Sequence, residues 1–182
     1  MSLETHFRRK NAGFTIVELM FTVFIAAILF AVAIPSFRGM MANNRIVTQT
    51  NEIIGAMAFA RSEAITRNRT ITFCRADNDT DTTCSAVAGN WGFWIIRNGA
   101  GDVSRRGTLP TYGGTMRVTS TLTLDRIAFG ADGLARDSAG TLLNLQQIDV
   151  CSTYDSGQNK RGIVMGSSSR VTVGKSSSAG VC

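Results

Sequence analysis

The stretch Phe14-Thr-Ile-Val-Glu-Leu-Met-Phe-Thr-Val-Phe-Ile-Ala-Ala-Ile-Leu-Phe-Ala-Val-Ala-Ile34 decides the architecture of this 182-residue chain. Of its 21 residues, 18 are apolar, and the exceptions are Thr15, Glu18 and Thr22. A helix needs about 20 mostly apolar residues to cross the hydrocarbon core of a bilayer. No other run in the chain approaches that length. The sequence therefore predicts one membrane-spanning helix and excludes a multi-span membrane protein.

Basic residues stand directly before the apolar run. The first 13 residues carry three basic side chains, Arg8, Arg9 and Lys10, and one acidic side chain, Glu4. Because positive flanks stay in the cytoplasm, the amino end of the helix is expected inside and the rest of the chain outside. A secretory signal peptide begins in the same way. This run, however, is longer than the usual apolar core of a signal peptide, and no small-x-small cleavage site follows it.

Glu18 is the one charged residue inside the apolar run. A carboxylate in the membrane costs about 2–3 kcal/mol on insertion scales, and such residues usually serve a function and have a partner. The simpler alternative is that Glu18 lies close enough to the helix end for its carboxylate to reach the membrane interface. The surrounding residues favour the functional interpretation.

Residues 10–20, Lys-Asn-Ala-Gly-Phe-Thr-Ile-Val-Glu-Leu-Met, closely resemble the type IV prepilin signature. In that family a prepilin peptidase cuts between the glycine and the phenylalanine, here Gly13 and Phe14, and the new terminus at Phe14 is N-methylated. The family's glutamate corresponds to Glu18, which in the family pairs with the terminal amine of a neighbouring subunit. Such a partner makes a buried carboxylate tolerable. Pro35 matches the family's helix-kinking proline.

The resemblance implies three segments: a prepilin leader over 1–13, a hydrophobic membrane and assembly helix over 14–42, and a periplasmic head over 43–182. Removing the leader changes the net charge from +6 to 16 − 12 = +4 and removes His6, the only histidine. Catalysis that depends on histidine and metal sites with histidine ligands then have no residue to use. We therefore expect no enzyme activity, no cofactor and no metal site.

Beyond Pro35 the apolar residues keep a helical period, which predicts a helix over about 14–67 with bends at Pro35 and Gly39. From Thr70 the pattern changes to short, often alternating segments separated by glycine-rich turns. The predicted strands cover 70–75, 92–97, 116–122, 126–129, 147–151, 161–165 and 170–173. The expected helical stripe that packs on these strands is Ile46, Ile53, Met57, Ala60 and Ala64.

Residues 59–74, 91–99, 129–136 and 166–172 resemble the GspH/FimT-type minor pilins and pseudopilins. With the leader, the resemblance covers nearly the whole chain. It implies an α+β type IV pilin fold: a long N-terminal helix whose apolar half protrudes and whose amphipathic half packs on an antiparallel β-sheet of the head.

This resemblance also implies a function. The chain would be a minor pilin of a type IV pilus, incorporated at or near the tip, where it primes assembly. Its implied partners are other major and minor pilins, the prepilin peptidase and the inner-membrane assembly platform. It would span the bacterial inner membrane once, with its N-terminus cytoplasmic and its head periplasmic, before entering the pilus. A minor pseudopilin of a type II secretion system is an alternative that the sequence does not separate.

The four cysteines, Cys74, Cys84, Cys151 and Cys182, all follow the membrane segment. An even number outside the cytoplasm predicts disulfides, for which three pairings exist. We favour Cys74–Cys84, which closes a short loop, and Cys151–Cys182, which ties down the carboxy terminus. Zinc is disfavoured because no Cys-x-x-Cys spacing occurs.

The first cysteine loop contains Asp77, Asp79 and Asp81 at a spacing that resembles the start of a calcium loop. An EF-hand would need glycine where Thr82 stands and glutamate where Ala88 stands. A solvated acidic turn is the expected structure. Beyond this loop, Trp91, Phe93 and Trp94 are expected to pack in the core, with a subunit contact as an additional role.

DNA binding for uptake in natural transformation is a second alternative function. Some FimT-type minor pilins bind DNA through two arginines of a carboxy-terminal Gly-Arg-x-Arg-like motif. Here Arg170 is separated from Gly166 by three serines, and Thr172 stands in place of the second arginine. Backbone contacts with DNA need clustered cations. The candidate DNA-binding residues are Lys160, Arg161, Arg170 and Lys175.

Overall fold

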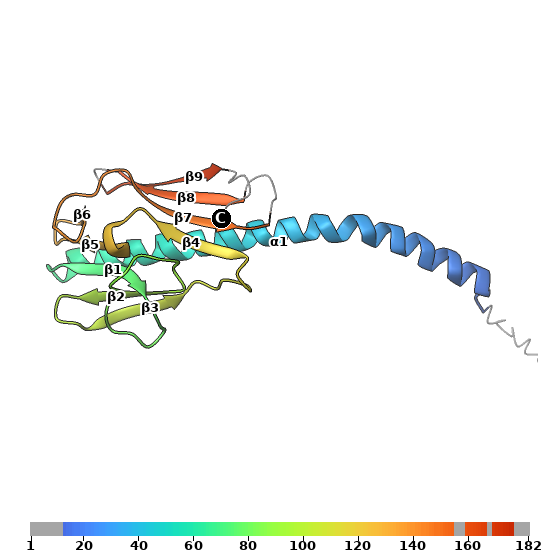
Figure 1. The fold of residues 1–182 in the computed structure, drawn as a ribbon, viewed down its shortest axis with the longest axis horizontal. Helices are drawn as coiled ribbons and strands as arrows, with labels where there is room; N and C mark the ends of the chain where they lie inside the picture. Colours follow the sequence, from blue (N-terminus) through green and yellow to red (C-terminus); the bar gives the residue numbers. More distant parts are fainter. Residues whose placement is uncertain (1–12, 155–158, 167–168, 177–182) are drawn as a thin grey trace, which may run out of the picture. The chain divides into compact units, whose positions relative to one another are not determined.

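The computed structural model describes residues 13–154, 159–166 and 169–176. The chain divides into two compact units, Met1–Arg38 and Gly39–Cys182. The helix α1, Ile16–Thr66, contributes residues to both units (Figure 1). It ends within one residue of the predicted position and includes Pro35 without a break in the assigned helix.

The part of α1 that belongs to the second unit packs along one face. Its buried residues recur at spacings of three and four, as expected for a helix with one face on a core. The structure confirms the predicted stripe, since all five of its members are buried. The full buried set is Ala42, Ile46, Gln49, Thr50, Ile53, Ala56, Met57, Ala60 and Ala64.

After the helix the chain forms two antiparallel sheets (Figure 1). Sheet A has the strand order β3-β2-β1-β5-β6, and sheet B has the order β4-β7-β8-β9. The strands of sheet A are β1 Ile71–Ala76, β2 Phe93–Asn98, β3 Val103–Thr108, β5 Arg126–Phe129 and β6 Ala135–Arg136. Those of sheet B are β4 Met116–Ser120, β7 Gln146–Ser152, β8 Lys160–Met165 and β9 Val171–Ser176.

The sequence predicted seven of these strands and one sheet. It missed β3 at the edge of sheet A and the two-residue β6. It also extended the strand at 116–122 too far, since a 3-10 turn begins at Thr123 and the strand ends at Ser120. β3 reads Val-Ser-Arg-Arg-Gly-Thr and buries none of its residues, so it lacks the apolar alternation that marks a strand.

One hydrophobic cluster joins the helix to both sheets. Phe73 of β1 lies at its centre, with ring centroids 5.2 Å from Trp91 and 5.7 Å from Trp94. Both tryptophans are fully buried, whereas Phe93 is half-buried on the opposite face of β2. The expected packing role of the tryptophans is therefore confirmed.

Gly107 on β3 is opposite Trp94 in the β2–β3 register. A Cβ atom at Gly107 would overlap the indole ring of Trp94, which is buried and has no room to move. We expect Gly107→Ala to lower the free energy of unfolding by about 1–3 kcal/mol, the usual cost of overpacking. Thermal unfolding of the full-length protein in detergent measures this loss.

The matched control is Gly174→Ala on β9, because an added Cβ there meets no atom within 4 Å. That change should alter stability by no more than about 0.5 kcal/mol. Equal effects of the two substitutions would contradict the packing of Trp94 over Gly107.

Candidate assembly segment and surfaces of the head

The start of α1 is capped by its own sequence. The backbone N–H of Glu18 donates to Thr15 Oγ1 at 3.2 Å, and the N–H of Leu19 donates to the Thr15 carbonyl at 3.1 Å. Thr15-Ile-Val-Glu18 is the capping-box pattern, with threonine at the N-cap and glutamate three residues later. A carboxylate in the first turn also interacts favourably with the positive end of the helix dipole. Glu18 thus has a local role in addition to any intersubunit role.

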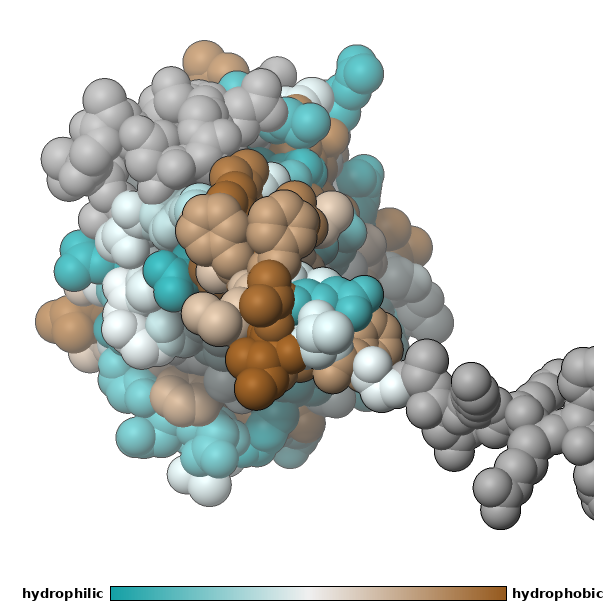
Figure 2. Space-filling model, turned by 90° about the vertical axis from the view of Figure 1, so that its right-hand side faces the viewer, coloured by the Kyte–Doolittle hydropathy of each residue, from teal (hydrophilic) through white to brown (hydrophobic). Residues whose placement is uncertain are grey.

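Within the first unit, the apolar side chains of α1 are exposed. Figure 2 is viewed from the side of the N-terminal end of α1. Apolar side chains, in brown, gather on the face toward the viewer. By length and composition, α1 is the one helix in the described part of the chain that could cross a membrane. The large apolar side chains left exposed run from Phe14, at 79% exposure, through Phe21, Phe24 and Phe30 to Phe37. An apolar surface of this extent needs lipid or protein to cover it.

The predicted cleavage site lies just before the helix. Gly13 and Phe14 precede the first helical residue, and no atom lies within 4 Å of a Cβ built on Gly13. The peptide bond between them is thus outside the regular helix. Residues 1–12 of the predicted leader lie outside the described residues.

The disulfide Cys74–Cys84 is present, with the two Cα atoms 5.6 Å apart, so this predicted pairing is confirmed. Cys151 is also disulfide-bonded. Its predicted partner, Cys182, lies outside the described residues, so the pairing Cys151–Cys182 stays a prediction.

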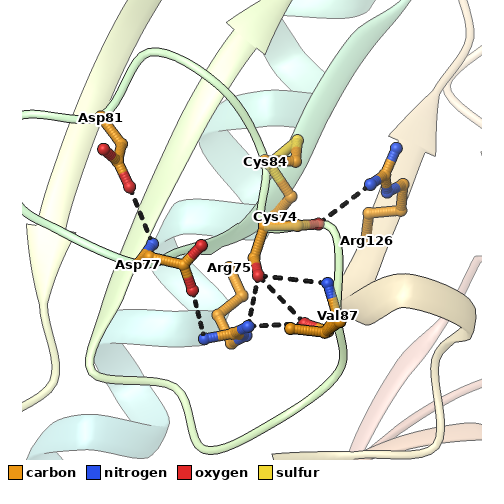
Figure 3. The surroundings of a disulfide bond; sticks show 8 residues. Cys74, Arg75, Asp77, Asp81, Cys84, Val87 and Arg126 are labelled. Atoms are coloured by element: carbon orange, nitrogen blue, oxygen red, sulfur yellow. Dashed lines mark hydrogen bonds and ion pairs between the residues drawn. A yellow bond between two sulfur atoms is a disulfide. The ribbon is translucent and has the colours of Figure 1, made fainter.

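The Cys74–Cys84 disulfide and Arg75, the residue after Cys74, hold the 77–90 loop from opposite faces of β1 (Figure 3). Cys74 lies with Ile95 and Ala76 in a small second cluster, on the face of sheet A opposite the main core. Arg75 is on the other face, and its guanidinium donates to Ser85 Oγ and to the Val87 carbonyl. The loop is therefore held by a covalent bond on one side of the sheet and by hydrogen bonds on the other.

Arg75 is buried at 8% exposure, which requires compensation of its charge. Its Nη1 lies 3.0 Å from Asp77 Oδ1, and its Nε lies 3.4 Å from Asp125 Oδ2. Asp125 is itself 1% exposed and accepts hydrogen bonds from the Gly89 N–H, at 2.7 Å, and from the Ser120 hydroxyl. This Arg75–Asp125 pair joins the loop, β1 and the turn before β5.

The sequence did not predict the Arg75–Asp125 pair. The one feature of the sequence that indicates such a pair is Arg75 itself, which follows a cysteine in an apolar strand, where a charge needs a partner. The partner lies 50 positions further along the chain, and sequence alone does not bring the two together.

The acidic turn in the loop uses its carboxylates locally. Asp81 Oδ2 accepts the backbone N–H groups of Asn78, at 2.9 Å, and Asp77, at 3.0 Å. The Asn78 N–H in particular holds the pKa of the Asp81 carboxyl below its usual value. This arrangement is a hydrogen-bonded turn, as the solvated-turn interpretation predicted.

Replacing both Cys74 and Cys84 with serine should lower the free energy of unfolding by about 3 kcal/mol, because the open loop has more freedom in the unfolded chain. Urea unfolding of the full-length protein in detergent, followed by tryptophan emission, measures the change. Thr82→Ser in the same loop is a control that leaves the bond in place. A loss below about 1 kcal/mol would show that the bond does not restrain the unfolded chain as expected.

The structure does not bring the four candidate DNA-binding residues into one cluster. Lys160 forms an ion pair with Asp149 at 2.9 Å. Arg161 is opposite Lys175 in the β8–β9 register, at the end of the hairpin far from Arg170. Since a strand rises about 3.3 Å per residue, Arg170 and Lys175 lie roughly 17 Å apart along β9.

Arg170 instead lies beside α1. It lines an apolar groove of about 330 Å³ together with Ile54, Met57, Arg61 and Val171. Arg61 donates from Nη1 to the Ser169 carbonyl at 3.3 Å. The helix thus supplies a second cation next to Arg170 that the sequence analysis did not consider.

Residues 49–174 match the family model for the type II transport protein GspH, and residues 8–34 match the prokaryotic N-terminal methylation motif. No curated protein matches significantly.

Among solved structures, the chain is similar to the type IV minor pilin FimU of Pseudomonas aeruginosa strain PAO1. The TM-score is 0.53 at 16% identity, covering 72% of this chain and 90% of FimU. A second crystal form of FimU gives a TM-score of 0.45 at 15% identity, with coverages of 73% and 89%. At this identity the first likeness shows the fold, a long N-terminal helix followed by antiparallel sheets.

Proposed function

We propose that this chain, which belongs to the GspH family of type II transport proteins, is a minor pilin that enters a type IV pilus at or near its tip and primes assembly. The observation that carries the proposal is the exposed apolar helix with an acidic residue in its capped first turn, directly after a Gly13–Phe14 junction. Such a helix suits the membrane before assembly and a bundle of like helices afterwards.

In the proposed pathway the chain inserts once into the bacterial inner membrane, with its amino end cytoplasmic and its head periplasmic. Prepilin peptidase cleaves between Gly13 and Phe14, and Phe14 is N-methylated. Glu18 then pairs with the Phe14 amine of a neighbouring pilin as the inner-membrane platform adds subunits. Pro35 lacks a backbone N–H, so one helical hydrogen bond near the end of the apolar segment is absent.

Processing is tested by mass spectrometry of the chain expressed with and without a prepilin peptidase. We expect a mature protein that begins at methylated Phe14, and Gly13→Leu should leave the chain uncleaved because the larger side chain does not fit a site built for glycine. Gly39→Ala, within the helix, is the control. Cleavage at any other bond would refute the assignment.

The place in the filament is tested by quantifying the chain in sheared pili and by immunogold labelling. A tip component should be present at far lower abundance than the major pilin and should label one end only. Labelling along the whole filament would exclude the tip role. Loss of secretion with intact surface filaments, after deletion of the gene, would favour a type II secretion pseudopilus instead.

DNA uptake is a weaker alternative. Two observations weigh against it, since backbone contacts need clustered cations: Arg170 lies far from Arg161 and Lys175, and Lys160 is paired with Asp149. Arg61 and Arg170 both line the groove beside α1, and this pair of cations is the observation that favours DNA binding. A mobility shift at low salt that is lost in the Arg170→Ala variant would support it.

A further inference from the structure

The outer face of sheet A holds a cavity of about 280 Å³ that none of the roles above uses. Its floor comes from the three central strands, because Thr72 of β1 is opposite both Arg97 of β2 and Ala128 of β5 in the register. Cys84 closes the cavity next to Arg126. We call this site the arginine pocket, defined by Thr72, Cys84, Arg97, Asn98, Arg126 and Asp137.

Arg97 has no partner for its guanidinium. Among the described residues it makes no hydrogen bond and no ion pair, and its Nε is buried without an acceptor. A guanidinium carries five N–H donors, and donors buried without acceptors are costly. The buried Nε–H of Arg97 therefore lacks an acceptor, which an oxygen of a ligand in the cavity could supply.

Arg126 is nearly as free. One Nη donates to the Ser85 carbonyl at 3.1 Å, while its Nε is buried without an acceptor. Figure 3 shows this arginine beside the Cys74–Cys84 disulfide, which fixes the start of the loop that carries Ser85. The disulfide thus orients the second cation of the pocket in advance of any ligand.

The other charged groups nearby are already engaged. Arg136 binds both oxygens of Asp132, at 2.9 and 2.6 Å, and these hydrogen bonds hold the pKa of the Asp132 carboxyl well below its usual value. Asp137 Oδ1 accepts the backbone N–H groups of Ala139 and Thr141 at 2.8 and 2.9 Å. Among the described residues, neither acid forms an ion pair with Arg97 or Arg126.

The ligand must therefore supply an oxyanion. Arg97 is on β2 and Arg126 is on β5, and β1 lies between these two strands. The two strands are about 10 Å apart across the sheet, so a group inserted between the arginines can reach both side chains. A nucleic acid would bring several phosphates and place some of them near the carboxylate of Asp137, which lines the pocket. A peptide brings an isolated carboxylate, together with N–H groups that the second oxygen of Asp137 can accept. Arginine binds carboxylates with two parallel hydrogen bonds.

We propose that the arginine pocket binds a carboxylate side chain from an acidic segment of another protein chain. The site goes beyond the proposed assembly role, which uses the apolar helix. It gives the head a contact of its own, selective for acidic partners.

The test uses the full-length protein in detergent micelles, labelled with ¹⁵N at arginine. The probe is a peptide of alternating glutamate and glycine whose two termini are blocked and carry no charge. The matched control peptide has glutamine in place of every glutamate. We expect the Nε–H signals of Arg97 and Arg126 to shift and saturate with the glutamate peptide only. The assay needs no membrane or filament, so its result is independent of the proposed function.

Arg97→Gln and Arg126→Gln should each weaken binding about tenfold, because each removes charge-assisted hydrogen bonds to the carboxylate. Arg69→Gln is the control, since Arg69 is an exposed arginine outside the pocket. Arg97→Lys should keep part of the affinity. Unmoved Arg97 and Arg126 signals in the unsubstituted protein, equal binding of the glutamine peptide, or tighter binding of a thymidine decanucleotide would each overturn the proposal.

Discussion

Replacing Glu18 with alanine is expected to leave cleavage after Gly13 intact and to lower incorporation into surface filaments at least tenfold. In the proposed assembly the Glu18 carboxylate meets the Phe14 amine of a neighbour among apolar helices. Removing one partner of a buried ion pair leaves the other charge uncompensated, at a cost of about 3–5 kcal/mol. Since 1.4 kcal/mol is a factor of ten in an equilibrium, even part of that cost gives the expected loss.

The measurement compares cleaved protein in the membrane with protein in sheared filaments. Glu52→Ala is the matched control, because Glu52 lies on the same helix in the second unit and is half-exposed. Glu18→Gln should fall between the two, since it keeps the size and hydrogen-bonding capacity of the side chain and loses the charge. Normal incorporation of Glu18→Ala would remove the intersubunit role and leave Glu18 as a capping residue.

Asp125→Asn should lower the free energy of unfolding of the head by about 3–5 kcal/mol. The substitution keeps the shape of the side chain and suits the positive φ of 49° at this position, which asparagine tolerates. It removes the buried negative charge that faces Arg75 and leaves only neutral hydrogen bonds to the Gly89 N–H and the Ser120 hydroxyl. Urea unfolding in detergent, followed by emission from the buried Trp91 and Trp94, reports the loss.

Asp77→Asn is the control for this experiment, because it removes the other carboxylate that pairs with Arg75. The Asp77 side chain is 55% exposed, so water screens its interaction. Exposed ion pairs contribute about 0–1 kcal/mol, and the control should stay within that range. If the two variants lose the same stability, burial of Asp125 does not control the strength of the pair.

Much of the fold follows from the period of the apolar residues. The 3.6-residue period predicted the buried face of α1, and the short segments beyond it predicted seven of the nine strands found in the described residues. These features could be predicted because each is a local pattern whose burial needs no knowledge of the partner element. The Cys74–Cys84 loop could be favoured for the same reason, since its two ends are close in sequence.

The division of the strands into two sheets could not be predicted, because it depends on pairing between distant segments. β1 pairs with β5 across more than 50 residues of chain, and no local pattern marks that choice. The same limit hid the Arg75–Asp125 pair and the arginine pocket, where Arg97 and Arg126 come together only through β1. Register also decides where the candidate cations lie: it places Arg161 opposite Lys175 at one end of the β8–β9 hairpin and leaves Arg170 at the other end.

The cap at the start of α1 has a consequence for maturation. Thr15 and Glu18, which close the first turn, both lie on the carboxyl side of the Gly13–Phe14 bond. Proteolysis there breaks no hydrogen bond of the cap, so the precursor and the cleaved subunit share one helical starting point. In the proposed maturation, removal of the leader leaves this cap in place and exchanges a basic tail for a single ammonium group that a neighbour's carboxylate can recognise.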